Sequence, residues 1–325
     1  EIMQSHKLAN VLYDIRGPVL EEAKRLEAAG HRIIKLNIGN PQPFGFETPP
    51  EVLVEVVRNL PISQGYSDSQ GILSARTAVV QHYQERGIDI TDVDDVWLGN
   101  GVSELIPVAL NALLNEGDEV LIPTPYWVSY PDMTLLAGGE PRFVEGGEET
   151  GFKITAASLE AAITSKTKWL ILNSPNNPTG SAYTREELAS LGEVLERHPH
   201  VWIMTDDMYE HLVYDDFEFT TIAQVTPSLF DRTLTMNGVS KAYAMTGWRI
   251  GYVHSDESII KEIIKIHDAL VTCAPVVSQY GAMGALEMGD KDLQAFNESY
   301  KIRRDLMCKR LDKLSEVFSY VYPES

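Results

Sequence analysis

The sequence predicts an α/β fold in which a large domain with a doubly wound, mostly parallel sheet stands beside a smaller domain. From about residue 100 onward, short apolar runs alternate with amphipathic segments of helical length. With 325 residues, the chain is long for one ordinary domain and short for three. Together these observations favour consecutive strand and helix units in one large domain with a smaller partner.

The strands of this sheet are expected at the short apolar runs. These runs lie at residues 96–98, 118–123, 168–173, 201–205, 232–237 and 248–253. Helices fit between them. In residues 184–198, for instance, leucines recur at intervals of three and four residues after a capping threonine, Thr184.

The two ends of the chain have different patterns. Residues 18–29 have the composition of an acidic and basic helix, whereas residues 31–62 contain five of the 17 prolines, a density that predicts an irregular connector. Residues 256–317 follow a nearly continuous helical pattern. We therefore predict an N-terminal arm with part of the small domain at 1–45, the ligand-binding large domain at 46–290, and the start of the C-terminal small domain at 291–325.

The charge of the chain argues against several classes of partner. Lys and Arg number 27 against 47 Asp and Glu, a formal charge of -20, which would repel nucleic acid and anionic membranes over most of the surface. No apolar run approaches the length of a membrane span, and the first residues lack a signal-peptide pattern. The two cysteines, Cys273 and Cys308, are far apart and are expected to be reduced. We expect a cytoplasmic protein without nucleic-acid or membrane partners.

Ligands of parallel sheets bind beyond the carboxyl ends of the strands, so the residues after each run are the first candidates for a site. After residues 96–98, "GNGVSEL" places Gly99 and Gly101 before a helix, where backbone N–H groups can hold a phosphate. The same glycines could form a simple turn with Ser103 as the capping residue. Glu119 does not end the next strand, and a third glycine is lacking, so a dinucleotide fingerprint is not supported.

The other strand ends carry side chains whose roles are open at this point. Lys241 follows the run at 232–237 and could be a solvated lysine or an amine nucleophile with a lowered pKa. Arg249 could be a surface cation or a bidentate phosphate ligand, and Trp127 could be a core or rim aromatic. Asp206 could cap a helix or serve as a charge partner in a site.

The neighbouring Asp207 and His211 are four residues apart, as in some metal sites, but no third ligand has suitable spacing. We therefore expect no metal. Taken together, these side chains are the parts needed to hold pyridoxal 5'-phosphate (PLP). The parts are a lysine, a phosphate cradle with an arginine, an aromatic plate, a carboxylate, and an Asn and a Tyr with free polar groups.

The sequence resembles the class I aminotransferases of the aspartate aminotransferase superfamily, which have the PLP fold type I. The resemblance extends from about residue 7 to residue 320. It rests on the stretches "SPNNPTG", "TDDMYEHL" and "NGVSKAYAMTGWRIGY", with support from "GNGVSEL", "PTPYWVSYP" and "GYSDSQG".

The resemblance implies a transaminase in which Lys241 forms the Schiff base with PLP and moves the substrate proton. Asp206 would pair with the pyridine nitrogen, Tyr209 and Asn177 would hydrogen-bond the ring hydroxyl, and Trp127 would stack on the ring. It also implies a homodimer with shared active sites. The residues implied to hold the cofactor are Gly101, Val102, Ser103, Trp127, Asn177, Asp206, Tyr209, Ser240 and Arg249, with Tyr66 reaching it from the second subunit.

The substrate signals are mixed. The first hundred residues resemble bacterial alanine aminotransferases, in which the counterparts of Tyr13 and Arg16 line the substrate pocket. The stretch from "GDEVLIPTPYWVSYP" to "MTGWRIGY" resembles bacterial aspartate aminotransferases. Gly39 matches a loop beside the substrate carboxylate or is a plain turn glycine, and Asn177 would also face the substrate. Aspartate-type relatives carry a lysine near Glu104, so its acidic side chain favours alanine with 2-oxoglutarate over a dicarboxylate pair.

Two departures from the family pattern bear on phosphate binding and on the function. Gly238 replaces a phosphate-binding hydroxyl of many relatives, which leaves more of the phosphate to Ser240 and Arg249. Relatives continue beyond the position of Ser325 with small-domain strands and an arginine for the substrate carboxylate, so we expect the small domain to be incomplete here. An aspartate aminotransferase, a PLP-binding protein of low activity and a PLP-dependent lyase are the alternative functions.

Overall fold

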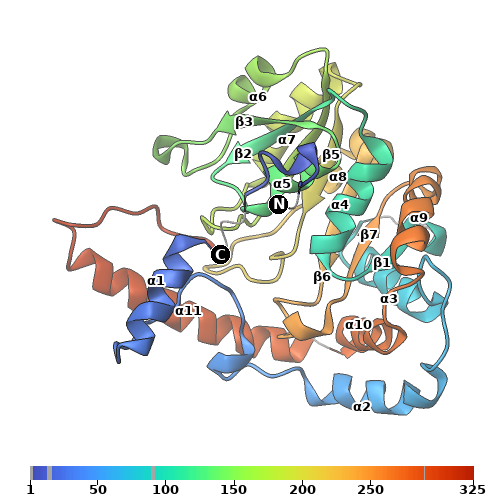
Figure 1. Cartoon of the computed structure of the whole chain (residues 1–325), viewed down its shortest axis with the longest axis horizontal. Helices are drawn as coiled ribbons and strands as arrows, with labels where there is room; N and C mark the ends of the chain where they lie inside the picture. Colours follow the sequence, from blue (N-terminus) through green and yellow to red (C-terminus); the bar gives the residue numbers. More distant parts are fainter. Residues whose placement is uncertain (1–2, 13–16, 89–91, 289) are drawn as a thin grey trace.

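The structure is a computed structural model that describes residues 3–12, 17–88, 92–288 and 290–325. Among these residues, one sheet of seven strands forms the centre of the molecule, with helices on both faces (Figure 1). The strands are β1 (Val96–Gly99), β2 (Glu119–Thr124), β3 (Glu140–Glu145), β4 (Thr167–Asn173), β5 (Trp202–Asp206), β6 (Thr233–Gly238) and β7 (Gly251–His254).

The order of the strands across the sheet is β1-β7-β6-β5-β4-β2-β3. Strands β2 to β6 pair in parallel, and β7 is antiparallel to both of its neighbours, β1 and β6. The carboxyl ends of β1, β2, β4, β5 and β6 therefore lie at one edge of the sheet, which confirms the predicted mostly parallel α/β fold.

The helices give the sheet its two covering layers and form the adjoining parts. They are α1 (Pro18–Ala28), α2 (Pro50–Asn59), α3 (Leu73–Gln84), α4 (Val102–Leu113), α5 (Ser129–Leu136), α6 (Ala156–Ala162), α7 (Arg185–Arg197), α8 (Ile222–Val225), α9 (Glu257–Val271), α10 (Val276–Met288) and α11 (Asp290–Asp312). The long α11 lies at the edge of the molecule, on the same side as α1 (Figure 1).

Alternating strand residues pack into different layers of the core. Val120 and Ile122 of β2 pack with α4 and α9 on one face, whereas Leu121 packs with α7 on the other. Trp169 and Leu170 of β4 divide in the same way. Both faces of the strands are buried, which explains why they appear in the sequence as continuous apolar runs.

Two predictions about local structure were wrong. The connector predicted at 31–62 contains α2, whose Val52 and Val56 are buried against α10. Pro49 is the N-cap of this helix and Pro50 its first residue, positions where the missing N–H of proline costs no helical hydrogen bond.

The last predicted strand starts later than expected. Thr246–Trp248 form a 3-10 turn, and Arg249 takes a left-handed conformation with φ 51°, so β7 begins only at Gly251. Strand β3 was not predicted at all, because its charged residues suit an edge strand better than a buried run. None of the described helices is both long enough and apolar enough to span a membrane.

Candidate active site

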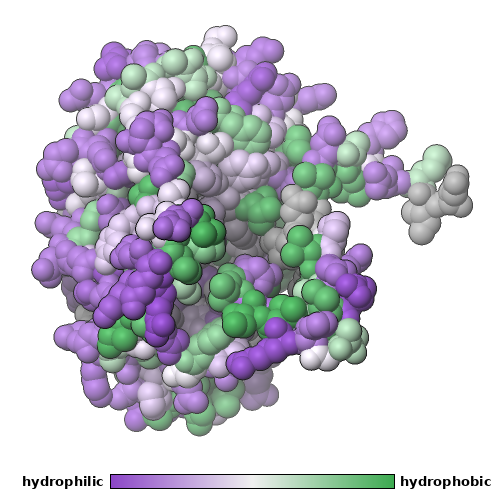
Figure 2. All heavy atoms as spheres, turned by 90° about the vertical axis from the view of Figure 1, so that its left-hand side faces the viewer, coloured by the Kyte–Doolittle hydropathy of each residue, from purple (hydrophilic) through white to green (hydrophobic). Residues whose placement is uncertain are grey.

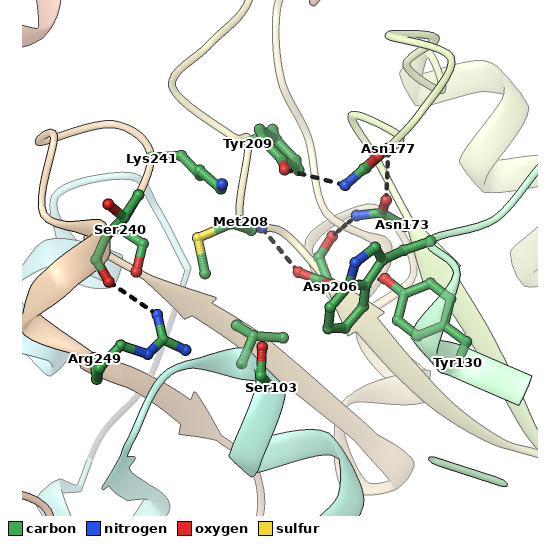
Figure 3. A pocket seen from close by; sticks show the side chains of 13 residues that line it. Ser103, Tyr130, Asn173, Asn177, Asp206, Met208, Tyr209, Ser240, Lys241 and Arg249 are labelled. Atoms are coloured by element: carbon green, nitrogen blue, oxygen red, sulfur yellow. Dashed lines mark hydrogen bonds between the residues drawn. The ribbon is translucent and has the colours of Figure 1, made fainter. Parts of the chain in front are cut away.

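A cavity among the described residues, which we call the principal cavity, lies at the edge where the parallel strands end (Figure 3). Segments that follow β1, β2, β4, β5 and β6 all contribute to it, as does the turn before β7. The lining residues are Val102, Ser103, Trp127, Tyr130, Asn173, Asn177, Asp206, Met208, Tyr209, Ser240, Lys241, Thr246 and Arg249. The strand ends that the sequence singled out therefore meet at one place.

One side of the cavity is suited to an anion. Ser240 and Arg249 lie there together, with Ser103 in the first turn of α4 (Figure 3). Gly101 is the N-cap of this helix with φ +81°, and a Cβ at this position would lie 2.8 Å from Nη2 of Arg249. Only glycine at this position allows the guanidinium to lie so close to the start of the helix, where the free N–H groups add donors.

The opposite side is built around the buried carboxylate of Asp206, the last residue of β5. The hydroxyl of Tyr130 donates to its Oδ2 at 2.7 Å, and the backbone N–H of Met208 donates to its Oδ1 at 3.2 Å. Burial raises the pKa of Asp206 to about 6, although these two hydrogen bonds act in the opposite direction. The carboxylate has no cationic partner among the described residues, so a cation in the cavity would stabilise its charge.

A chain of amides continues from Asp206 to the cavity mouth. Asn173 donates to the backbone oxygen of Asp206 at 2.8 Å and accepts from the backbone N–H of Asn177 at 2.7 Å. The amide of Asn177 in turn lies 3.4 Å from the hydroxyl of Tyr209. Figure 3 shows this chain and the Tyr209 hydroxyl on the same side of the cavity as the amine of Lys241.

Lys241 is half-buried, and its amine donates to the backbone oxygen of Gly39. Burial lowers its pKa, and the positive charge of Arg249 lowers it further. A larger fraction of the amine is therefore neutral near physiological pH than for an exposed lysine, and the neutral amine is the form that attacks a carbonyl.

A second, mainly apolar cavity borders the other side of Lys241. Its residues are Ile38, Gly39, Asn40, Pro41, Phe44, Phe46, Tyr209, Leu212, Lys241, Tyr300 and Arg303. Figure 2 looks onto the side of the molecule where α1 and α11 lie, and this face is hollowed with hydrophobic side chains around the hollow. Arg303 of α11 lies over the ring of Phe46 and donates to the backbone oxygen of Phe44 at 3.1 Å.

The family model for aminotransferase class I and II matches residues 31–325 of this chain. The chain belongs to the class I and II aminotransferases. It is 48% identical over 315 residues to an aspartate/prephenate aminotransferase of Cereibacter sphaeroides, covering 94% of this chain and 78% of the relative. It is 43% identical over 290 residues to a glutamate-pyruvate aminotransferase of Escherichia coli, covering 88% and 71%.

A solved aspartate aminotransferase of Rhizobium meliloti matches this aminotransferase with a TM-score of 0.90 at 37% identity, over 94% of this chain and 76% of the other. Since the aligned part is nearly the whole chain, the fold type I prediction is confirmed along with the family.

Most predicted site residues lie in the principal cavity. Gly101 stands at its edge, and Gly39 lies beside Lys241 in the second cavity. Tyr66 is 90% exposed and lines neither cavity, and its role toward a second subunit stays a prediction. Tyr13 and Arg16 lie outside the described residues.

The structure corrects the role given to Glu104. This residue accepts from the backbone N–H and the side-chain amide of Asn100, and it lies 3.3 Å from Nδ1 of His267, away from the principal cavity. Successive residues of a helix point in different directions, so the residue of this turn that faces the cavity beside Ser103 is the apolar Val102. Glu104 therefore gives no argument about the substrate.

Four lining residues were missed by the sequence reasoning: Tyr130, Asn173, Met208 and Thr246. Tyr130 lies three residues after Trp127, so both could have been assigned to one face of a helical turn. Asn173 is the last residue of a predicted strand and was counted as part of it rather than as part of the rim.

Proposed function

We propose that this aminotransferase binds PLP in the principal cavity and transfers an amino group between an L-amino acid and a 2-oxo acid, with alanine and 2-oxoglutarate as the favoured pair. The observation that carries the proposal is the shared cavity of Lys241 and the buried Asp206, whose far side holds Ser103, Ser240 and Arg249. An amine, a carboxylate and an anion cradle are the groups that PLP requires.

The donor set fits this cofactor at both ends. The guanidinium of Arg249, which lies against Gly101 at the start of α4, would accept a phosphate together with Ser103 and Ser240. At the other end, burial raises the pKa of Asp206, whose carboxylate lacks a positively charged partner. The protonated ring nitrogen of PLP would be such a partner. Trp127 and Tyr209 provide aromatic and hydroxyl contacts along the wall between the two ends.

Bound PLP would supply an aldehyde and a ring that takes up the electron pair of the broken substrate Cα–H bond. Lys241 would act first as the nucleophile and then, once free, accept the proton from Cα at Nζ and deliver it to the carbon of the former cofactor aldehyde. The negative charge of Asp206 would keep a proton at the ring nitrogen. The hydroxyl of Tyr130 and the N–H of Met208 would hold its carboxylate in place. Tyr209 and Asn177 would orient the ring through their polar heads.

The favoured substrate pair is supported by the 43% identity to a glutamate-pyruvate aminotransferase and by Val102, which offers no cation to a distal carboxylate at the cavity. A second candidate is an aspartate or prephenate substrate, supported by the 48% identical relative. Arg303 beside the apolar second cavity would suit a substrate with a second carboxylate and a hydrophobic body.

The test is a half-reaction on PLP-loaded protein, followed by the loss of visible absorption after addition of L-alanine, L-aspartate or L-glutamate. Conversion with alanine and glutamate is expected, and Lys241→Ala should abolish it. Faster conversion with aspartate would favour the second candidate. Release of ammonia from a β-substituted amino acid without a 2-oxo acid would indicate a lyase, and a visible band unmoved by any amino acid would overturn the transaminase proposal.

We also propose a homodimer in which Tyr66 reaches the cavity of the second subunit. Its support is the run of exposed apolar side chains on and after α2, namely Leu53, Val54, Val57, Leu60 and Ile62. A cytoplasmic location is supported by the two unpaired cysteines. The predicted division into an arm, a large domain and the start of a small domain completes the proposal.

A further inference from the structure

A buried charged cluster lies directly behind the turn that follows β5. Its members are His82 of α3, Arg86 just after α3, and Glu210 and His211 of the turn. Only 2% of the Glu210 side chain and 5% of the His82 side chain are exposed. None of these residues lines the principal cavity, and the functional proposal assigns none of them a role.

Both oxygens of the Glu210 carboxylate have partners in this cluster. Oε2 lies 2.9 Å from Nη1 of Arg86, and Oε1 lies 3.1 Å from Nε2 of His82 and 3.1 Å from Nε2 of His211. Burial alone would raise the pKa of Glu210, but His211, His82 and Arg86 outweigh it and hold the pKa well below its usual range. The carboxylate is therefore charged and fixed.

Arg86 also contacts His211. Its Nη2 lies 3.0 Å from Nδ1 and 3.3 Å from Nε2 of the ring, and a guanidinium can only donate, so the histidine is the accepting partner. Nε2 of His211 also lies 3.1 Å from Oε1 of Glu210. Arg86 therefore contacts two residues of the turn, Glu210 and His211.

Two histidines and a glutamate with ligand atoms within 4.8 Å of one another could also suggest a metal site. The guanidinium of Arg86 argues against this assignment, since it already neutralises Glu210 and lies within 3.3 Å of both ring nitrogens of His211. Arg86 would repel a divalent cation, and the cation would have to compete with Arg86 for the carboxylate of Glu210.

The turn has two sides with different tasks. Asp206 and Tyr209 face the cavity, whereas Glu210 and His211 face α3 (Figure 3 shows the cavity side). Among the described residues, the hydroxyl of Tyr209 is held by one long hydrogen bond, 3.4 Å from the amide of Asn177. The neighbouring Glu210, in contrast, is held by three side chains, so the backbone of the turn is anchored from behind.

We propose that the Arg86–Glu210 ion pair is a positioning element of the reaction, which locks the turn 207–211 onto α3 and so sets the Tyr209 hydroxyl and the Asp206 carboxylate around the cofactor. This inference rests on the proposed binding of PLP in the principal cavity. Arg86 and Glu210 touch neither cofactor nor substrate, and their effect passes through the backbone of the turn.

The test uses PLP-loaded protein and compares Arg86→Met with the charge-preserving Arg86→Lys. A hydroxyl that donates to the cofactor favours the deprotonated chromophore, so displacement of Tyr209 should raise the pH at which the visible absorption titrates, by about one unit. We expect Arg86→Met to show this shift and a roughly tenfold weaker affinity for PLP, and Arg86→Lys to recover at least half of both changes.

Two further variants separate positioning from stability. Arg86→Met/Glu210→Gln removes the ion pair without leaving a buried charge unpaired, so it should fold and still show the spectral shift. Arg232→Met is the matched control: Arg232 binds the backbone oxygens of Leu195 and His198 at the opposite end of the sheet. It should lower the unfolding temperature and leave the titration unchanged.

Wild-type titration and PLP affinity in both Arg86 variants, with only the unfolding temperature lowered, would overturn the inference and leave the proposed function intact. Failure of the wild-type protein to bind PLP would instead overturn the proposed function, and this inference with it.

Discussion

Asp206 and Glu210 are four residues apart, are 5% and 4% exposed, and yet differ in charge environment. Asp206 faces the cavity with a hydroxyl and an N–H group as partners, and its pKa is raised to about 6 by burial. Glu210 faces α3 with an arginine and two histidines, which hold its pKa well below its usual range despite burial. One side of the turn keeps a carboxylate available for a ligand, and the other side uses a carboxylate to hold the turn.

The middle of the turn adds a third case. Asp207 is 1% exposed and accepts from the hydroxyl of Thr205 at 2.6 Å. Burial raises its pKa to about 8. At neutral pH, Asp206 is therefore mainly ionised and Asp207 mainly protonated, so that two adjacent carboxyl groups have different charges because of their surroundings.

The largest expected effect is that of Asp206→Asn. The amide cannot hold a proton at a ring nitrogen, so kcat of the PLP-loaded variant should fall about 1000-fold. Stability should respond differently. Since the folded pKa of Asp206 is raised, its contribution to stability is full below about pH 4 and is lost as the pH rises through about 6, so the cofactor-free variant should unfold no earlier than wild type at pH 8. Steady-state kinetics and thermal unfolding measure the two effects, and near wild-type turnover would refute the role of Asp206.

A smaller effect is expected for Tyr130→Phe, which removes the donor to Oδ2 of Asp206. The pKa of Asp206 should rise further, and the acid limb of the kcat/KM profile should move to higher pH by about one unit, with about twofold lower activity at pH 7 and roughly tenfold lower activity at pH 5. Tyr126→Phe is the control, because Tyr126 stacks on Phe143 outside the principal cavity. An equal shift in both variants would argue against the Tyr130 hydrogen bond as the cause.

The smallest effects are expected for the cofactor-free protein in two matched variants, Asp207→Asn and Glu210→Gln. The folded pKa of Asp207 is raised to about 8, so its contribution to stability is full below about pH 4 and is lost as the pH rises through about 8. Asp207→Asn should therefore be more stable than wild type on the alkaline side. The slope for one proton is at most about 1.4 kcal/mol per pH unit.

Glu210 should behave in the opposite way. Its lowered folded pKa contributes stability above about pH 4.5 that is lost as the pH falls through the folded value, so Glu210→Gln should lose stability at neutral pH and flatten the acid side. Denaturant unfolding between pH 4 and pH 9 measures both variants. Parallel pH curves for the two would contradict the comparison between the two sides of the turn.

Much of the fold was predictable because its strands are buried on both faces. The runs 168–173 and 201–205 each contain four consecutive apolar residues, at 169–172 and 201–204, and lie within one residue of β4 and β5. The edge strand β3 was missed because its charged residues pair with each other and with a neighbour, as Arg142 does with Glu140 and Glu119. The helix α2 was missed because two prolines were weighed by number and not by their position at its start.

For the site, the sequence indicated which strand ends matter but not what lies behind them. Lys241, Asp206 and Arg249 follow predicted strands and stand in a recognisable pattern. Two partners of Glu210, His82 of α3 and Arg86 just after it, are more than a hundred residues away, and only the packed structure brings them together. Glu104 shows the same limit, since its direction on α4 could not be read from its type.

The central claim is that Lys241 carries PLP in the cavity it shares with Asp206. The most direct measurement is borohydride reduction of PLP-loaded protein, followed by proteolysis and mass spectrometry of the lysine peptides. We predict one stoichiometric adduct, on Lys241, that is lost in Lys241→Ala. An adduct spread over surface lysines, or a specific adduct on another lysine, would contradict the account.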